Sequence, residues 1–267
     1  MRLGKQDQPY SAISTSTPAA INVRGKNLCR DVIGQRDFTS WFWFLVTGSE
    51  PDERQVYFAN AVLTAIAEHG LVPSVVAARM TYAAAPVAFQ GAVAAGLLGC
   101  GSVVLGSAEV AGKFFGRLVE SGEEPATAIQ RLRAEKKAVP GFGHPLHAEG
   151  DPRANLLLKL AAERGAEGPH IAMLYRVRDA LPEAIGRPLP INVNGAIPAV
   201  MLDVGFPLGA LKGISLLART ASLIGHLQEE TERPIGFILS GKAAEAIGYD
   251  GPPSSVSENR NVEREDS

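Results

Sequence analysis

The densest group of residues able to do chemistry lies in a glycine-rich loop over residues 139–147, Val-Pro-Gly-Phe-Gly-His-Pro-Leu-His. Its glycines let the backbone turn tightly and approach a ligand, so that His144 projects from a rigid loop. Arg153 follows in the first turn of a predicted helix, where free N–H groups, the helix dipole and the guanidinium together favour a carboxylate or a phosphate. Lys136 and Lys137, just before the loop, add cations suited to a polyphosphate. This spacing predicts an anion-binding site.

Two other interpretations of the loop stay open at this point. His144 and His147 can instead be surface histidines with ordinary hydrogen-bond partners. A metal site built from His144, His147 and Asp151 would need a fourth ligand, which no neighbouring residue supplies. We therefore expect no bound metal.

Three further positions carry polar groups at the ends of helical patterns or inside one. Residues 68–70 (Glu-His-Gly) end a helix, which places an imidazole at a helix C-terminus, where it can also be a simple cap. Residues 192–195 (Asn-Val-Asn-Gly) precede a helix and can be an N-cap box. Arg219 lies within the otherwise apolar residues 216–224, and a buried guanidinium needs either a ligand anion or an acidic side chain.

The elements that must position these residues are helices. Apolar residues recur at helical spacing over residues 53–69 and 208–232. Asp151 and Pro152 supply an N-cap and a first-turn proline to a helix that ends at residues 164–165. We predict an all-α protein. Its further expected segments are helices at 169–181 and 197–204, long loops at 112–126 and 138–151, a weak strand at 20–24, and a mobile charged tail from 250 to 267.

Composition excludes several classes of protein. The 267 residues are enough to bury a large core. They include 26 Lys and Arg against 28 Asp and Glu, a net charge of −2 without a basic patch, which argues against a nucleic-acid partner. Cys29 and Cys100 match no metal or redox spacing, and the polar residues 1–9 do not resemble a signal peptide. We therefore expect a reduced, cytoplasmic setting.

Residues 80–108 form a run of 29 positions without a charge, long enough to raise the question of a membrane span. The run is rich in Ala and Gly, contains Pro86 and Gln90, and holds few large aliphatic side chains, so insertion into a bilayer would be weakly favourable. We instead expect a pair of helices buried on all sides in a soluble protein, with no membrane contact.

Five landmarks in chain order resemble those of the citrate synthase superfamily. They are residues 68–70, the small-residue stretch 97–109, the loop 141–144 with residues 151–153, residues 192–195, and Arg219 followed by Ile-Gly-His at 224–226. The resemblance covers residues 21–248 and is greatest to the short citryl-CoA lyase branch, including the C-terminal module of ATP-citrate lyase. It implies an all-α fold with a large domain (1–111 and 212–267), an inserted small domain (112–211), and an active site in the cleft between them.

The resemblance also implies roles for single residues. Those matching His69, Arg153 and Arg219 bind the carboxylates of oxaloacetate or citrate. The one matching His144 hydrogen-bonds the oxaloacetate carbonyl, or acts on the citryl hydroxyl in the cleavage direction. The loop that lies against coenzyme A corresponds to Lys136, Lys137, Pro140, Gly141, Phe142 and Gly143. An acyl-CoA and a di- or tricarboxylate would be the substrates, and no cofactor would be bound permanently.

The sequence departs from the family at catalytic positions. Asn194 stands where the family has the aspartate that exchanges a proton with the methyl group of acetyl-CoA, and an amide cannot move that proton. Leu105 replaces the histidine that polarises the thioester in citrate synthases, a loss shared with the ATP-citrate lyase module. The arginine usually supplied by the neighbouring subunit falls near Gly241, with Lys242 as a substitute that keeps the charge but not the bidentate fork. Pro145 follows the loop histidine in place of an arginine.

These observations leave two functions. The first is an enzyme that makes or cleaves a C–C bond between an acyl-CoA of the acetyl-CoA type and a 2-oxo acid of the oxaloacetate type, with Glu109 or His147 as candidates to replace the missing carboxylate. General acid–base assistance typically contributes about 10²–10⁴ in rate. The alternative is a catalytically impaired member that binds CoA esters or carboxylates as a sensor or partner subunit. The family also implies a homo-oligomer, a dimer or a dimer of dimers, with residues 80–108 packed against their symmetry mates.

Overall fold

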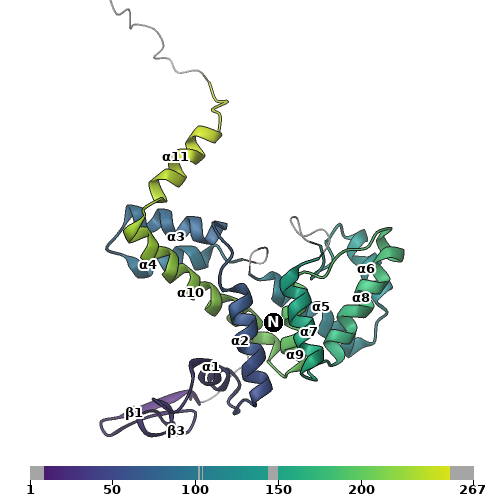
Figure 1. The fold of residues 1–267 in the computed structure, drawn as a ribbon, viewed down its shortest axis with the longest axis horizontal. Coiled ribbons are helices and arrows are strands. Elements are labelled where there is room, and N and C mark those ends of the chain that lie inside the picture. Colours follow the sequence, from purple (N-terminus) through teal and green to yellow (C-terminus); the bar gives the residue numbers. More distant parts are fainter. Residues whose placement is uncertain (1–8, 102, 104, 144–149, 253–267) are drawn as a thin grey trace, which may run out of the picture.

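The computed structural model describes residues 9–101, 103, 105–143 and 150–252. Helices make up most of these residues, so the predicted all-α architecture is confirmed (Figure 1). A π-helix, η1 (Leu28–Val32), and a 3₁₀ turn, η2 (Leu208–Ala210), precede two of the helices. The α-helices are α1 (Phe38–Thr47), α2 (Glu53–Ala67), α3 (Pro73–Ala84), α4 (Phe89–Leu98), α5 (Ser107–Ser121), α6 (Pro125–Ala134), α7 (Pro152–Glu163), α8 (Pro169–Ile185), α9 (Val193–Asp203), α10 (Leu211–Glu232) and α11 (Gly236–Ala246).

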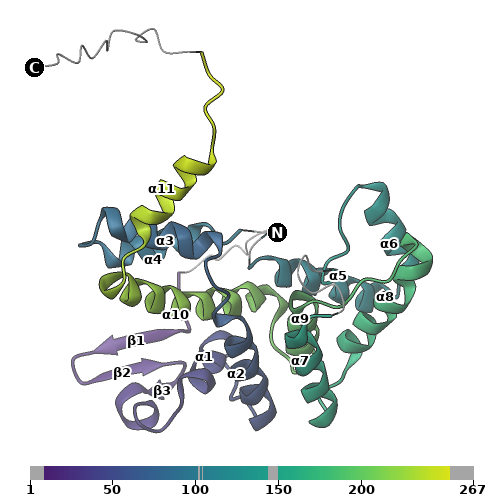
Figure 2. The same cartoon turned by 45° about the horizontal axis from the view of Figure 1, so that its top comes forward.

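The helices form two groups that meet along α2, α9 and α10 (Figures 1 and 2). In one group α5 packs on α8 and α9, α6 packs on α8, and α7 packs on α9. In the other, α3 packs on α4, α10 and α11, while α2 packs on α1 and α10. Figure 2 shows α10 extending from the neighbourhood of α9 to α3 and α4. The predicted domain boundaries stay a prediction.

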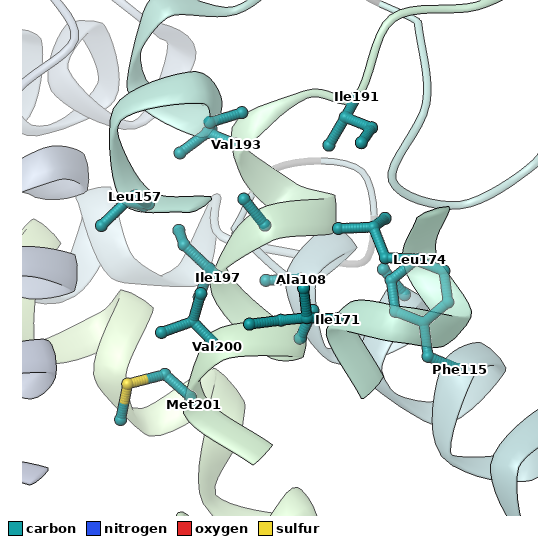
Figure 3. Close-up of a cluster of buried hydrophobic side chains, with 14 of the residues drawn as sticks. Ala108, Phe115, Leu157, Ile171, Leu174, Ile191, Val193, Ile197, Val200 and Met201 are labelled. Carbon is teal, nitrogen blue, oxygen red and sulfur yellow. The ribbon is translucent and has the colours of Figure 1, made fainter. Parts of the chain in front are cut away.

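The main core surrounds α9, which α2, α5, α7 and α8 contact. Because neighbours cover several of its faces, α9 is apolar nearly all round, as a buried helix requires. Its side chains Val193, Ile197, Val200 and Met201 point among those of Leu157, Ile171 and Leu174 from α7 and α8 (Figure 3). This core fixes the position of the first turn of α9, which carries Asn194.

The helix start predicted at Asp151 and Pro152 is confirmed. Asp52 caps α2 in a capping box with Gln55, and the Asp151 side chain accepts from the backbone N–H of Arg153 at 3.0 Å at the start of α7. The helix predicted at 197–204 begins earlier, at Val193, because Asn192 is its N-cap and accepts from the N–H of Gly195 at 3.2 Å.

The long loop predicted at 112–126 is wrong. Helix α5 runs to Ser121 through two glycines, and α6 begins at Pro125. Glycine lowers helix propensity, but packing against neighbouring helices outweighs that cost here. At Gly112 an added Cβ would lie 2.5 Å from Leu211 Cδ1 and 3.1 Å from Pro198 Cβ, so the missing side chain permits close packing of α5 on its neighbours.

The strand predicted at residues 20–24 is part of a small antiparallel sheet. Its strands β1 (Ser14–Thr17), β2 (Ala20–Val23) and β3 (Lys26–Asn27) lie in the order β1-β2-β3. Ser14 pairs with Val23, and Asn22 with Asn27. The guanidinium of Arg24 donates to the carbonyl of Leu45 at 2.8 Å, which fastens the sheet to α1.

The uncharged residues 80–108 contribute the end of α3, all of α4 and the start of α5. None of the helices in the described part of the chain has the length and apolar character needed to cross a bilayer. The expectation that these helices are buried on all sides is wrong within one chain. Ala92 and Gly96 of α4 are buried, whereas Val87 is 95% and Leu98 is 87% exposed. The C-terminal tail predicted to be mobile lies, from residue 253 onward, outside the described residues.

Candidate active site

One pocket brings together the polar residues singled out along the sequence. Its volume is about 360 Å³, and it lies where α2, α5, α7, α9 and α10 come near one another. It is lined by Ile66, His69, Val72, Pro73, Val103, Leu105, Ser107, Arg153, Val193, Asn194 and Arg219. Four predicted site residues, His69, Arg153, Asn194 and Arg219, therefore share one cavity, although the sequence separates them widely.

Arg219 is the most informative residue of this pocket. It comes from the middle of α10 and is only 3% exposed. Within the described chain, its Nε and Nη1 have no hydrogen-bond partner. The acidic side-chain partner that the sequence left open is therefore absent from this part of the chain. Because a buried guanidinium without a counter-charge is costly, the pocket is suited to an anionic ligand.

Arg153 reaches the same pocket but has a partner of its own. Its Nε and Nη2 lie 3.0 and 2.9 Å from the two carboxylate oxygens of Asp151. Asp151 is completely buried, and its Oδ2 also accepts from the N–H of Val193 at 2.9 Å. Burial raises the pKa of Asp151, but these hydrogen bonds and the charge of Arg153 outweigh burial and hold the pKa below its ordinary value. Asp151 thus joins the starts of α7 and α9.

The described part of the glycine loop lies directly on the segment before α9. The N–H of Gly143 donates to the carbonyl of Pro190 at 2.8 Å, and that of Asn192 to the carbonyl of Gly141 at 3.0 Å. Gly141 has φ +86°, and a Cβ on Gly195 would lie 2.5 Å from the Gly141 oxygen. Glycine is therefore required at both positions, which places Asn194 beside the loop.

The family is decided by comparison with known proteins. The family model described as the citrate synthase C-terminal domain matches residues 8–236. The chain belongs to the citrate synthase family. The structure of citryl-CoA lyase from Hydrogenobacter thermophilus is similar with a TM-score of 0.84 and 28% identity, covering 92% of this chain and 95% of that one.

Longer members of the citrate synthase family are also similar. Citrate synthase 2 of Bacillus subtilis is 28% identical over 194 residues, which are 71% of this chain and 51% of that protein. The chain therefore spans about half the length of that curated relative. The structure of ATP citrate lyase from Methanothrix soehngenii, in complex with citrate and coenzyme A, shares the fold with a TM-score of 0.77 and 22% identity, covering 94% of this chain and 43% of that one.

Two of the four positions at which the sequence is predicted to depart from the citrate synthase family line the same pocket. Asn194 and Leu105 are both lining residues, and Leu105 has φ 65°, a left-handed conformation that costs a residue with a side chain about 1–3 kcal/mol. Glu109, considered as a replacement base, does not line the pocket and pairs with Lys113 at 2.5 Å. His144, Pro145 and His147 lie outside the described residues.

A second cavity of about 360 Å³ borders the predicted coenzyme A loop. Lys136, Lys137 and Phe142 line it, as expected for residues of that loop. Arg133 and Arg187 line it as well, and sequence reasoning missed both. They come from the end of α6 and from the segment after α8, and no spacing in the sequence connects them to the loop.

Lys242 is not brought to the carboxylate pocket by its own chain. It lies on α11, is exposed, and pairs with Glu245 at 2.6 Å. Figures 1 and 2 show α11 projecting away from the rest of the helices. In the described residues there is no cluster of three His, Cys, Asp or Glu side chains arranged to hold a metal ion.

Proposed function

We propose that the chain makes or cleaves a C–C bond between an acyl-CoA of the acetyl-CoA type and a 2-oxo acid of the oxaloacetate type. The observation that carries the proposal is the buried guanidinium of Arg219, whose Nε and Nη1 have no hydrogen-bond partner among the described residues, in a pocket that also holds Arg153 and His69. Membership of the citrate synthase family and the likeness to citryl-CoA lyase supply the reaction class.

In this proposal His69, Arg153 and Arg219 bind the carboxylates of the 2-oxo acid or of its citryl adduct. Arg219 takes the ligand as its missing counter-charge, whereas Arg153 is held in place by Asp151 and presents its remaining donors. Binding at fixed guanidinium groups orients the bond that reacts. Neither substrate carboxylate then needs water as a partner.

The cleavage direction defines what the other groups must do. A base takes the proton of the citryl hydroxyl, the C–C bond breaks to give the 2-oxo acid, and the electron pair passes to the enolate of the acyl-CoA. That enolate then takes up a proton at carbon, for which His147 is the remaining candidate from the sequence, and this proton balances the one taken from the hydroxyl. We assign the hydroxyl to His144 from the family resemblance. Asn194 stands where the resemblance places the family's aspartate, which exchanges a proton with this carbon. Its amide can donate a hydrogen bond to the enolate oxygen but cannot transfer a proton to the carbon.

Coenzyme A would lie along the second cavity, against Lys136, Lys137 and residues 140–143. Arg133 and Arg187 on the wall of that cavity add charges suited to the phosphates of a nucleotide. The two predicted domains would close over the thioester and exclude water. No permanently bound cofactor takes part in the proposal.

We further propose a cytoplasmic homo-oligomer, a dimer or a dimer of dimers. Two free cysteines, Cys29 and Cys100, fit a reducing compartment. Several large apolar side chains that are uncovered within one chain lie on α4, on α11 and in the connection between α3 and α4; they include Val87, Leu98, Phe237 and Ile238. A second copy of the chain would cover them and would supply Lys242 to the pocket of its neighbour.

A second candidate function is favoured by Asn194. An impaired family member that binds CoA esters or carboxylates, as a sensor or as a subunit beside an active homologue, would keep both cavities and lose the carboxylate at this position. The two candidates differ in turnover, not in binding.

The test is an assay of the purified protein with citryl-CoA, and with acetyl-CoA plus oxaloacetate or related 2-oxo acids. Release or consumption of free CoA is followed, with binding of citrate and of CoA measured in parallel by calorimetry. Turnover supports the enzyme, and binding without turnover supports the impaired relative. The absence of both would contradict both candidates.

A further inference from the structure

A carboxylate stands at the end of α2, where a helix disfavours it. Glu68 is the C-cap of α2, next to His69. The carbonyl end of a helix carries a partial negative charge, so an acidic side chain there is unfavourable unless other groups compensate for it. In this protein the compensating groups are the hydrogen-bond donors around Glu68.

One oxygen of Glu68 holds the turn that presents His69. Its Oε1 accepts from the N–H of His69 at 2.8 Å and from the N–H of Gly70 at 2.5 Å. Gly70 has φ +70°, a left-handed conformation in which the chain bends at this point. The backbone on both sides of the His69 side chain is thus fixed by a single carboxylate.

The other oxygen of Glu68 is bound by α10. Its Oε2 accepts from Oγ of Ser222 at 2.5 Å and from Nε2 of His226 at 3.0 Å. Residues three and four apart on a helix lie on one face, so Ser222 is one turn beyond Arg219. Glu68 therefore joins the His69 turn to the part of α10 that carries Arg219.

A buried ionic group fixes the far side of His226. Nη1 of Arg79 lies 3.3 Å from Nδ1 of His226. Because arginine can only donate, Nδ1 is the acceptor, and the neutral imidazole carries its proton on Nε2, directed at Glu68. Arg79 is itself held by Glu230 at 2.6 Å, with both side chains 2% exposed, and by Glu229 at 2.8 Å.

The electrostatic setting of Glu68 agrees with this arrangement. Burial raises the pKa of its carboxyl, but the hydrogen bonds from Ser222, from the N–H of Gly70 and from His226 lower the pKa to about 2. The carboxylate is therefore ionised over the whole physiological range and keeps its acceptor role.

We propose that Glu68 is a positioning residue, which sets the orientation of His69 and its separation from Arg219, and that His226 holds Glu68 in that position. This inference rests on the proposed function, in which His69 and Arg219 bind substrate carboxylates. It adds a role for the histidine of the Ile-Gly-His segment, which the proposed chemistry does not use.

The first test compares two ligands on the full chain. Glu68→Ala removes four hydrogen bonds to a charged group, and we expect it to weaken citrate binding in calorimetry by about tenfold or more. Coenzyme A binding should stay within about twofold, because Glu68 does not line the CoA cavity. Unchanged citrate affinity, or an equal loss for both ligands, would overturn the proposal.

Smaller changes keep the test decisive if Glu68→Ala folds poorly. Ser222→Ala removes one of the two hydrogen bonds from α10 to Glu68, leaves the one from His226, and should weaken citrate binding in the same direction. Glu68→Gln still accepts from the two N–H groups but faces the Nε2–H of His226 with its own amide donor. Glu68→Gln combined with His226→Ala should then lose no more affinity than the worse single variant. Additive losses would contradict the link between the two residues.

A matched control and a second measurement separate this inference from the proposed function. Glu163→Ala also removes a glutamate at the end of a helix, one in a surface pair with Lys159 at 3.7 Å, and should match the wild type. If the wild type binds no citrate, the proposed function fails. The inference is still tested by NMR, because the ring resonances of His69 should shift in Glu68→Ala and not in Glu163→Ala; unshifted His69 resonances would overturn it.

Discussion

The guanidinium of Arg153 lies on the carboxylate of Asp151, with Nε 3.0 Å from Oδ1 and Nη2 2.9 Å from Oδ2. Asp151 therefore balances the charge of Arg153 and fixes its orientation before a ligand binds. Arg219 has no such acidic partner among the described residues. Arg153 is thus positioned by the protein, whereas the counter-charge of Arg219 is supplied by the ligand. This difference gives the pocket a net positive charge suited to a carboxylate.

Asp151→Asn should lower stability in a pH-dependent way. In the folded protein the pKa of Asp151 lies below its ordinary value of 3.8. The stabilisation is therefore present above that value and is lost as pH falls through the lower, folded pKa. At pH 7 we expect the substitution to cost about 3 kcal/mol, because it leaves Arg153 without its partner. Urea unfolding of the wild type and the variant measures this cost, and the difference in their free energies of unfolding should narrow in acid. A difference that is constant with pH would contradict the lowered pKa of Asp151.

Arg219→Met should abolish carboxylate binding without destabilising the fold. Arg219 is 3% exposed, and its Nε and Nη1 have no partner in the described chain, so we expect the free energy of unfolding to rise by about 1–3 kcal/mol. Arg79 is equally buried, at 2%, but fully paired, so Arg79→Met should cost about 3–5 kcal/mol. Chemical denaturation measures the free energy of unfolding of the two variants, which should rise for Arg219→Met and fall for Arg79→Met. Citrate titrations measure the loss of binding. Equal destabilisation by the two substitutions would show that Arg219 has a structural partner.

Much of the fold follows from local signals in the sequence. Asp151 and Pro152 set the start of α7, and Asn192 sets that of α9, because a cap acts on the N–H groups of the next turn. Helix α5 could not be predicted in the same way. Gly112 in this helix is explained by close packing against Leu211 and Pro198, which lie far along the chain, and a propensity scale does not contain those contacts.

The candidate site also contains residues that could be predicted from the sequence and a contact that could not. The resemblance identified His69, Arg153, Asn194 and Arg219, and these residues do line one pocket. It gave no hint of the bond between Glu68 and His226, which are 158 positions apart. A carboxylate at a helix end is an ordinary surface feature in a sequence, and its partners appear only when α2 lies along α10.

Gly195→Ala should disrupt the site through the backbone. The added Cβ would lie 2.5 Å from the Gly141 oxygen and 3.0 Å from its Cα, and backbone atoms in a hydrogen-bonded loop cannot move aside cheaply. We expect a cost of about 1–3 kcal/mol and a matching loss of ligand binding. Gly213→Ala is the control, since no atom lies within 4 Å of its Cβ in α10, and it should stabilise the helix by up to about 1 kcal/mol. Thermal unfolding of both variants measures these changes. An unchanged melting temperature for Gly195→Ala would contradict the close packing of Gly195 on Gly141.

Leu98→Glu should weaken the proposed assembly while leaving the chain folded. Leu98 is 87% exposed within one chain, so a carboxylate there meets water unless a second copy covers it. Ala92 is unsuitable for this test because it is completely buried in its own chain. Sedimentation velocity should show dissociation of Leu98→Glu at concentrations where the wild type is oligomeric. Ile33→Glu, at a site 62% exposed beyond η1, serves as the control. An oligomer unaffected by Leu98→Glu would place the interface elsewhere.

Asn194→Asp distinguishes the enzyme from the impaired relative. If the amide has a role in turnover, a carboxylate at this position removes its N–H donors and competes with the substrate for Arg153 and Arg219, so activity should fall. If the site is merely disabled, restoring the acid–base group should raise citryl-CoA cleavage by about 10²–10⁴. The proposed function expects the fall. Asn155→Asp adds the same charge at an exposed position one turn into α7 and should leave turnover unchanged. Initial rates of CoA release from citryl-CoA measure all three proteins, and a large gain for Asn194→Asp would decide in favour of the impaired relative.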